Sequence, residues 1–216
     1  MYNVIGDIAG QYKTLKALIA KMPEGKVISV GDIIDRGPRS KEVVEYFMNT
    51  PNTEVLMGNH EHMMIEFYKS RKDPQYQTEY SSGIWQMNGG SATVVSFDHR
   101  VPSKEVFKFL ETRPLELKLD IDGKSFYISH AFAPSGRSLE EEESELVRKI
   151  WNRNQPIFNS QSADVQICGH NSQFGLRYWN DGNGKKAICI DTSRDKVLTG
   201  IHLPTLTLYQ QEYIDY

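Results

Sequence analysis

The sequence is 216 residues long, with 39% hydrophobic residues, 25% charged residues and a formal net charge of −3. This composition is typical of a globular protein with one sizeable core and excludes intrinsic disorder. The negative balance gives no reason to expect a nucleic acid as partner, and no stretch approaches the roughly 20 apolar residues that span a membrane. No linker, repeat or low-complexity segment interrupts the sequence, so we expect a single domain over residues 1–216. Because no signal-like segment precedes the first predicted strand, we expect it to act in the cytoplasm.

The first half of the sequence alternates predicted strands with predicted helices. Short apolar runs that end at glycine predict buried strands, and apolar residues spaced three and four apart predict helices. The strands are expected within residues 1–8 and at 27–30 and 54–57, and the helices at 10–22, 40–49 and from about residue 60 onward. Ser40 is the predicted N-cap of the second helix. This β-α-β-α-β order predicts a parallel sheet covered by helices.

The second half has a less regular pattern. Residues 69–90 mix polar and aromatic side chains without a clear period, which predicts a helical or irregular excursion. The Asp122-Gly123 pair between two apolar runs predicts a β-hairpin. The remaining predicted elements are helices at 106–112 and 138–151 and strands at 115–119, 125–129, 165–168, 176–179, 187–190 and 206–213. The acidic run at 140–143 is interpreted as a solvated helix face, and Cys168 and Cys189 as buried thiols of neighbouring strands.

Polar side chains follow several of these strands at the point where each strand ends. They are Asp7 after the first strand, Asp32, Asp35 and Arg36 after the second, Asn59 and His60 after the third, and His130 and His170 after two later apolar runs. In open α/β sheets, ligands bind beyond the carboxyl ends of the strands. Any one of these loops alone would also suit an ordinary turn. Three such loops in order, together with two histidines, predict a metal site.

Three motifs in this region resemble those of a known family. Gly-Asp-x-x-Gly, Gly-Asp-x-x-Asp-Arg-Gly and Gly-Asn-His-Glu occur in this order, about 25 residues apart. They resemble the calcineurin-like metallophosphoesterases, and within them the phosphoprotein phosphatase group. That group includes serine/threonine phosphatases, small bacterial and phage phosphatases, and symmetrical diadenosine tetraphosphate hydrolases. The resemblance extends from Gly6 to about Gly200 and implies an α/β fold in which a two-sheet β-sandwich is flanked by helices.

The resemblance also implies a centre of two divalent metal ions. Asp32 would bridge the two ions, and Asp7 would bind the first. The second ion would be bound by Asp32 together with three further ligands, namely Asn59, His130 and His170. These oxygen and nitrogen ligands, with no cysteine among them, suit manganese, with iron or zinc as alternatives.

The same resemblance assigns residues to the chemistry of phosphate ester cleavage. His60 would protonate the leaving alkoxide, with Asp35 orienting its ring through the other nitrogen. Arg36 would grip the phosphate oxygens, because a guanidinium makes bidentate contacts with them. Arg153 matches a second phosphate arginine of the family less securely, and a surface arginine after a helix is the alternative.

Ala9 is the informative departure from the family pattern. The family has histidine at this position, where it binds the first metal, and alanine has no atom that can coordinate. Gln11 also occurs in family members that keep the histidine, so it is not an evident substitute. The sequence therefore predicts a weak first metal site.

The function implied is a metal-dependent phosphoesterase that hydrolyses phosphomonoesters, with phosphoserine or phosphothreonine of proteins as candidate substrates. A dinucleoside polyphosphate hydrolase is the alternative, because Asn88-Gly89-Gly90 and Gly169-His170-Asn171 resemble elements of those enzymes. A third possibility, from a different class, is a catalytically weakened module that only binds phospholigands, and Ala9 is the single argument for it. In each case the partner is a phosphorylated protein or nucleotide.

Overall fold

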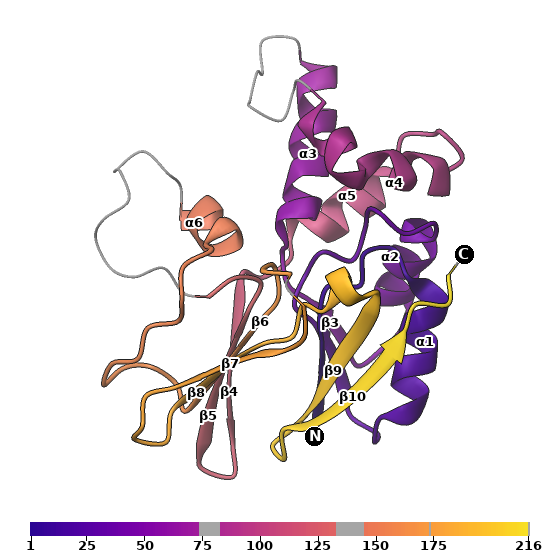
Figure 1. The fold of residues 1–216 in the computed structure, drawn as a ribbon. Coiled ribbons are helices and arrows are strands. Elements are labelled where there is room, and N and C mark those ends of the chain that lie inside the picture. The colour runs from indigo at the N-terminus through magenta and orange to yellow at the C-terminus, as the bar shows by residue number, and fades with distance from the viewer. Residues whose placement is uncertain (74–82, 133–144, 173, 216) are drawn as a thin grey trace.

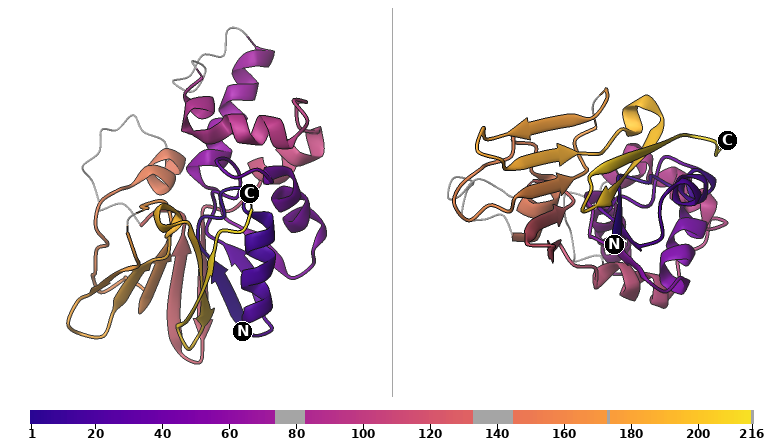
Figure 2. Two further views of the ribbon diagram at one scale, coloured as in Figure 1. Left: turned by 45° about the vertical axis from the view of Figure 1, so that its right-hand side comes forward. Right: turned by 90° about the horizontal axis from the view of Figure 1, so that it is seen from below.

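The computed structural model describes residues 1–73, 83–132, 145–172 and 174–215. Two five-stranded sheets pack face to face, with helices on the outside (Figures 1 and 2). The predicted fold class, a two-sheet sandwich flanked by helices, is confirmed. Among the described residues, no helix combines the length and the apolar character needed to cross a bilayer.

The first sheet has the strand order β10-β9-β1-β2-β3. Its parallel strands are β1 (Tyr2–Ile5), β2 (Lys26–Ser29) and β3 (Thr53–Val55), and its antiparallel strands are β9 (Val197–Leu203) and β10 (Thr207–Glu212). The helices α1 (Tyr12–Lys21) and α2 (Ser40–Asn49) connect the parallel strands and cover the outer face of the sheet (Figure 2). The predicted β-α-β-α-β unit is therefore confirmed.

The second sheet has the order β4-β5-β6-β8-β7. Its strands are β4 (Glu116–Ile121), β5 (Lys124–Ser129), β6 (Val165–Cys168), β7 (Arg177–Asn180) and β8 (Lys186–Cys189). The predicted hairpin at Asp122-Gly123 joins β4 to β5, and β5, β6 and β8 run parallel. Cys168 lies opposite Cys189 in the β6–β8 register and both thiols are free and buried, as expected for neighbouring strands.

A third group of helices lies above the strand ends in Figure 1. It comprises α3 (Asn59–Lys72), the π-helical turn η2 (Gln86–Gly90), α4 (Ser91–Ser96) and α5 (Lys104–Glu111). The helix α6 (Glu145–Trp151) is the described part of the predicted helix at 138–151. The predicted acidic run at 140–143 lies outside the described residues.

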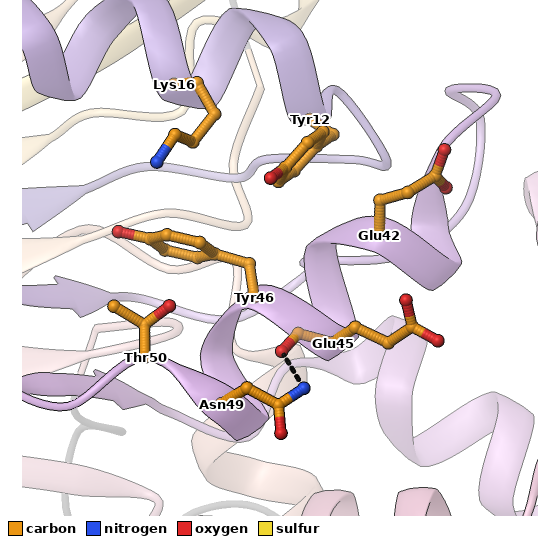
Figure 3. A pocket seen from close by; sticks show the side chains of 7 residues that line it. All are labelled: Tyr12, Lys16, Glu42, Glu45, Tyr46, Asn49 and Thr50. Carbon is orange, nitrogen blue, oxygen red and sulfur yellow. Dashed lines mark hydrogen bonds between the residues drawn. The ribbon is translucent and has the colours of Figure 1, made fainter.

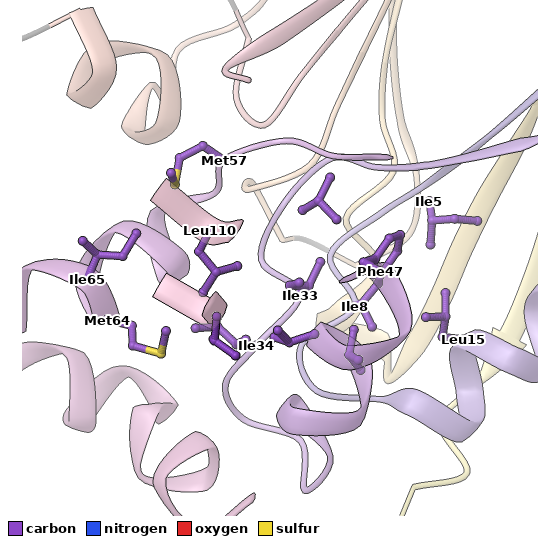
Figure 4. Packing of buried hydrophobic residues seen from close by; sticks show 14 of the residues in the cluster. Ile5, Ile8, Leu15, Ile33, Ile34, Phe47, Met57, Met64, Ile65 and Leu110 are labelled. Carbon is purple, nitrogen blue, oxygen red and sulfur yellow. The ribbon is translucent and has the colours of Figure 1, made fainter. Parts of the chain in front are cut away.

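Two apolar layers hold these elements together. One lies between the sheets and is built from alternate residues of the inner strands, such as Val4, Ile28, Ile128 and Ile167. The other lies between the first sheet and the helices, where side chains such as Leu15 and Phe47 meet (Figure 4). Each fully buried aliphatic or aromatic side chain stabilises the fold by ~1.5–3 kcal/mol relative to exposure, so these layers fix the strand ends that carry the site.

The C-terminal segment returns to the start of α1. The Asp215 carboxylate accepts hydrogen bonds from the backbone N–H groups of Lys13 (2.9 Å) and Thr14 (2.8 Å) and from the Thr14 hydroxyl (2.7 Å). A carboxylate at a helix N-terminus satisfies free N–H groups and complements the helix dipole. The cap of α1 is thus supplied from the far end of the sequence.

Two details differ from the sequence-based expectation. Strand β9 was not predicted, because it lies between two strands with six of its seven residues buried and therefore lacks an alternating pattern. Ser40 is not the N-cap of α2: the helix begins at Ser40, the preceding Arg39 is the cap residue, and the Ser40 hydroxyl instead accepts a hydrogen bond from the backbone N–H of Asp35 at 3.0 Å.

Candidate active site

The predicted second-metal ligands lie together where β2, β3, β5 and β6 end. Asn59 Oδ1 is 2.9 Å from His130 Nε2 and 2.8 Å from His170 Nδ1. Asp32 Oδ1 lies 3.4 Å from His130 Nε2. The possible ligand atoms of Asp32, His130 and His170 are all within 4.8 Å of one another and all three side chains are buried. The structure thus brings these four predicted residues into one cluster.

Asp7 borders this cluster from the end of β1. Its two carboxylate oxygens each lie 3.2 Å from the backbone N–H of His170. Glycine is needed at position 169, because a Cβ there would overlap the Asp7 carboxylate and contact the Val30 side chain. Burial, together with the nearby charges of Asp191 and Asp32, raises the pKa of Asp7 well above its ordinary value. Asp191, which the sequence did not single out, is therefore part of the electrostatic surroundings of the site.

The residues fit a divalent cation. Burial, reinforced by neighbouring His130, lowers the pKa of His170 to about 3, so the imidazole is neutral and able to coordinate. His170 Nε2 is buried and has no hydrogen-bond partner in the described part of the chain. A cation among the buried carboxylates would also relieve the repulsion that raises the pKa of Asp7. The donor set, the neutral imidazoles and the uncompensated negative charge all favour a metal at this position.

His60 lies beside the metal-ligand cluster and is held from three directions. Its Nδ1 is 2.6 Å from Asp35 Oδ2, its backbone N–H donates to Asp32 Oδ1 at 3.0 Å, and Arg36 Nη2 is 2.9 Å from its Nε2. Since a carboxylate only accepts and a guanidinium only donates, these partners assign the neutral tautomer with the proton on Nδ1. Burial lowers the pKa of His60, but the charges of Asp32 and Asp35 outweigh this and raise it above the ordinary value.

The Asp35 carboxylate has two partners that the sequence did not reveal. Trp85 Nε1 donates to Oδ2 at 2.8 Å, and the Thr93 hydroxyl donates to Oδ1 at 2.6 Å. Trp85 lies in the stretch 69–90 that lacked a clear period, and Thr93 lies just beyond it in α4. The Asn88-Gly89-Gly90 signal marks this approach, because a Cβ at Gly90 would overlap the Trp85 ring and one at Gly89 would lie 2.7 Å from Arg36 Cγ. These glycines let the segment close over Asp35.

Glu61 joins the second and third loops through one carboxylate. Its oxygens accept hydrogen bonds from the backbone N–H groups of Asp32 (2.8 Å), Ile33 (2.9 Å) and Gly58 (3.0 Å). Burial and the charge of Asp32 raise the pKa of Glu61 to about 8, against the opposing effect of the N–H donors. The residue was visible as the last member of Gly-Asn-His-Glu, three positions after Gly58, a spacing typical of a helix capping box. Its role in positioning Asp32 was not predicted.

The loops of the site carry unusual backbone conformations. Left-handed φ angles occur at Ala9 (48°), Asp32 (50°), Asp35 (72°), Arg36 (61°) and His170 (64°). Such conformations cost about 1–3 kcal/mol for residues other than glycine and persist only where the surroundings impose them. Here the cross-loop hydrogen bonds impose them, including the one from the backbone N–H of Ala9 to the carbonyl of Asp32 at 2.8 Å.

Two predicted features lie at the edge of the cluster. Ala9 is buried next to the Asp32 loop and offers only a methyl group. The neighbouring Gln11 is buried too, and its Oε1 has no hydrogen-bond partner within the described ranges. Arg153 is exposed, and its positive charge contributes to the lowered pKa of His170 after burial and His130, which places it on the same side of the molecule.

A family model for the calcineurin-like phosphoesterases matches residues 2–180, which is most of the chain. The protein belongs to this family. A serine/threonine-protein phosphatase 1 of Salmonella typhimurium is 27% identical over 159 residues, which cover 71% of this chain and 69% of that protein. A serine/threonine-protein phosphatase 2 of Escherichia coli is 28% identical over 180 residues, which cover 77% of this chain and 78% of that protein.

Solved structures of this calcineurin-like phosphoesterase fold agree with the observed architecture. A metallophosphoesterase from Sphaerobacter thermophilus superposes with a TM-score of 0.57 at 16% identity, covering 100% of this chain and 88% of that one. A protein serine/threonine phosphatase from Saccharomyces cerevisiae superposes with a TM-score of 0.56 at 14% identity, covering 100% and 80%.

Membership of the calcineurin-like phosphoesterases makes this protein a metal-dependent phosphoric ester hydrolase. It uses divalent metal ions and acts on phosphorylated substrates. The sequence-based prediction of a metal-dependent phosphoesterase is thereby confirmed. It is favoured over the alternative prediction of a module that only binds phospholigands.

Proposed function

We propose that this phosphoesterase hydrolyses phosphomonoesters, with phosphoserine and phosphothreonine residues of proteins as its substrates. The observation that carries the proposal is the proton donor beside the metal ligands: His60 Nε2 lies 3.8 Å from Asp32 Oδ2 while its Nδ1 is bound to Asp35. A leaving alkoxide needs a proton, and His60, when protonated on Nε2 as well as on Nδ1, would supply it from beside the residues that would hold the metal. Two bacterial relatives of similar length carry the name serine/threonine-protein phosphatase, which supports this substrate class.

Two divalent ions, manganese by preference, are assigned to residues of this chain. Asp32 would contact both, Asp7 would hold the first, and the second would be held by the amide and imidazoles of Asn59, His130 and His170. When bound, such ions neutralise phosphoryl oxygens and lower the pKa of a bound water so that it can attack phosphorus. Oxygen and nitrogen ligands in a mixed set suit manganese, iron or zinc.

The other polar groups bind the phosphate and move protons. Arg36 Nη2 lies 2.9 Å from His60 Nε2. A bound phosphate would attract the guanidinium to its own oxygens. His60 Nε2 would then be free to carry the proton for the leaving group. Asp35 keeps the ring in place through Nδ1 and stabilises the imidazolium form. Arg153, on the same side and exposed, would make the second cationic contact with the phosphate.

A dinucleoside polyphosphate hydrolase is the second candidate function. Symmetrical bis(5'-nucleosyl)-tetraphosphatases of Coxiella burnetii are 28% identical over 79 residues, which cover 34% of this chain and 27% of those proteins. The shared stretch is shorter than the one shared with the phosphatases. For that reason the phosphomonoester activity is placed first.

Two further assignments belong to the same proposal. Residues 1–216 form one metallophosphoesterase domain, which is supported by the family match from residue 2 to 180 and by the return of β9 and β10 to the first sheet. The protein acts in the cytoplasm, which is supported by two free thiols on directly paired strands, since thiols stay reduced in that compartment.

Metal analysis combined with a substrate panel tests the proposed function. The purified protein is analysed for manganese, iron and zinc, and then assayed with a phosphoserine peptide, p-nitrophenyl phosphate and diadenosine tetraphosphate. We expect turnover of the first two, and an Asp32→Asn variant that folds normally but has lost activity and bound metal. Hydrolysis of diadenosine tetraphosphate alone would favour the second function, and an active, fully metallated Asp32→Asn variant would refute the site.

A further inference from the structure

A cavity of about 580 Å³ opens beside the site described above. Its walls come from five segments: the loop after β1, the loop after β2, the loop after β6, the connection between β8 and β9, and the C-terminal segment after β10. Arg36 belongs to the wall and also reaches His60, and Ala9 lies at the edge of the metal-ligand cluster, so the cavity shares these two residues with the proposed active site.

The floor of the cavity carries polar atoms that lack partners. Ala9 contributes only a methyl group, which leaves space where a longer side chain would project. Next to it, the Gln11 side-chain oxygen and the Tyr213 hydroxyl are buried, and neither has a hydrogen-bond partner in the described segments. Gln11 as a whole is only 6% exposed. Buried polar groups without partners destabilise the protein, so a ligand that pairs with them is favoured. The Gln11 amide, if rotated, presents its NH₂ group.

The charge of the cavity is positive. Arg36, Arg194 and Lys196 line it, and the single acidic lining residue is Asp215. That carboxylate is already engaged by three hydrogen bonds at the start of α1 and lies 3.5 Å from Arg39 Nε. Its negative charge is shared with Arg39, so the three cations of the lining outnumber it and the cavity favours an anion.

The cationic rim is held in place by its own contacts. The backbone N–H of Arg194 donates to the Ser172 hydroxyl at 2.9 Å, and its guanidinium lies 4.7 Å from the centre of the Phe174 ring. The carbonyl of Lys196 accepts a hydrogen bond from the backbone N–H of Tyr213 at 2.8 Å, which joins the rim to the C-terminal segment. A side chain that is already oriented loses less conformational freedom when it binds a ligand.

We propose that this cavity is a subsite for a second phosphate group of the substrate. Resting on the proposed function, this inference makes the preferred substrates esters with two phosphate groups, one reacting at the metal ligands and the other held by Arg194 and Lys196. A phosphate group suits the cavity better than a carboxylate, because it carries close to two negative charges and three acceptor oxygens for the three cations and the Tyr213 hydroxyl. Arg36 lies between the two positions and contacts both groups.

Two matched substrate pairs test the subsite and distinguish its sources. The first pair is a peptide with one phosphoserine and the same peptide with two. The second is adenosine monophosphate and adenosine diphosphate, assayed at a fixed concentration of free metal ion. We expect kcat/KM to favour the member with two phosphates at least tenfold in one pair, and that pair identifies the source. No preference in either pair overturns the proposal.

Substitutions of the rim link any preference to the cavity. In Arg194→Gln and in Lys196→Gln, the preference should fall about three- to tenfold, as expected for the loss of one charge-assisted contact. Lys16→Gln is the matched control, because this lysine lines a separate hollow between α1 and α2 beside Tyr12 and Tyr46 (Figure 3). A preference that survives in both rim variants, or that falls equally in the control, overturns the subsite.

A binding measurement separates failure of the subsite from failure of the proposed function. If none of the substrates is hydrolysed, the proposed function fails, and calorimetric titration with pyrophosphate and orthophosphate still tests the cavity. The subsite is supported if pyrophosphate binds more tightly than orthophosphate and if Arg194→Gln reduces the affinity for pyrophosphate toward that for orthophosphate. Equal binding of the two anions overturns it.

Discussion

Replacing Glu61 by glutamine should destabilise the fold and displace the loop that carries Asp32. One carboxylate accepts three backbone N–H groups here, from Asp32, Ile33 and Gly58, and the side chain is fully buried. Glutamine has one acceptor oxygen and one NH₂ donor in the same space. If its oxygen takes the two donors from Asp32 and Gly58, the N–H of Ile33 faces another donor.

The magnitude follows from the number of N–H groups left without an acceptor. One such buried group costs about 1–3 kcal/mol, and two cost about 2–6 kcal/mol if the oxygen instead faces Ile33. We therefore expect Glu61→Gln to lower the free energy of unfolding by at least 1 kcal/mol, which is a large share of the stability of a typical domain.

Urea unfolding followed by circular dichroism measures this loss, and metal titration measures the effect on the site. Glu42→Gln is the matched control, because Glu42 forms a partly exposed ion pair with Arg39 at 2.8 Å, a contact that contributes at most about 1 kcal/mol. An unfolding free energy for Glu61→Gln within 0.5 kcal/mol of the unsubstituted protein, with unchanged metal affinity, would refute the role of Glu61 as the clamp between the loops.

Three further outcomes are expected. His60→Asn should lower turnover by ~10²–10⁴ for alkyl phosphates but less for p-nitrophenyl phosphate, whose leaving group needs little protonation; equal losses would argue against the proton-donor role. Ala9→His should tighten the first metal site in calorimetric titration, since histidine tolerates the left-handed φ of 48° at this position. Two equally tight metal sites in the unsubstituted protein would instead implicate another ligand. Burial alone would raise the pKa of Glu116, but hydrogen bonds from Tyr127 and Lys149 lower it from 4.5 to about 2. The stability that this depressed pKa contributes is present above pH 4.5 and is lost as the pH falls toward 2, so the difference in unfolding free energy between the unsubstituted protein and Glu116→Gln should shrink over that range; a difference independent of pH would contradict this.

The parts of the fold with a strong local pattern could be predicted from the sequence. The parallel strands of the first sheet, the helix at 40–49 and the hairpin at Asp122-Gly123 each have a periodicity or turn signal that depends on neighbouring residues alone. Strand β9 could not be predicted, because its two faces are buried by the two apolar layers on either side of the sheet, Leu198 in one and Ile201 in the other, and those layers are assembled by the tertiary fold. The Ser40 hydroxyl was assigned to the wrong partner for a similar reason, since the Asp35 loop that it contacts is brought there by the tertiary fold.

The candidate site divides in the same way. The residues that follow strand ends, such as Asp32, Asn59 and His130, could be picked out because strand order places them at one edge. The residues that support them, Trp85 and Thr93, lie in helical segments whose spacing carries no sign of a contact with Asp35. Their role depends on how the helices above the sheet close over the loop, which no local pattern encodes.

The position of β1 between β2 and β9 has a consequence for the synthesis of the protein. Ile5 pairs with Gly200, and Thr14 is capped by Asp215, so the strand that carries Asp7 gains its second neighbour only after about 200 further residues have been added. At roughly 5–20 residues per second, this interval lasts about 10–40 s on the ribosome. During this time the nascent chain already contains Asp7, Asp32 and His60, but the sheet that fixes them is incomplete. Phosphoesterase activity should therefore be absent from nascent chains and appear only once the last strands have been released and have closed the sheet.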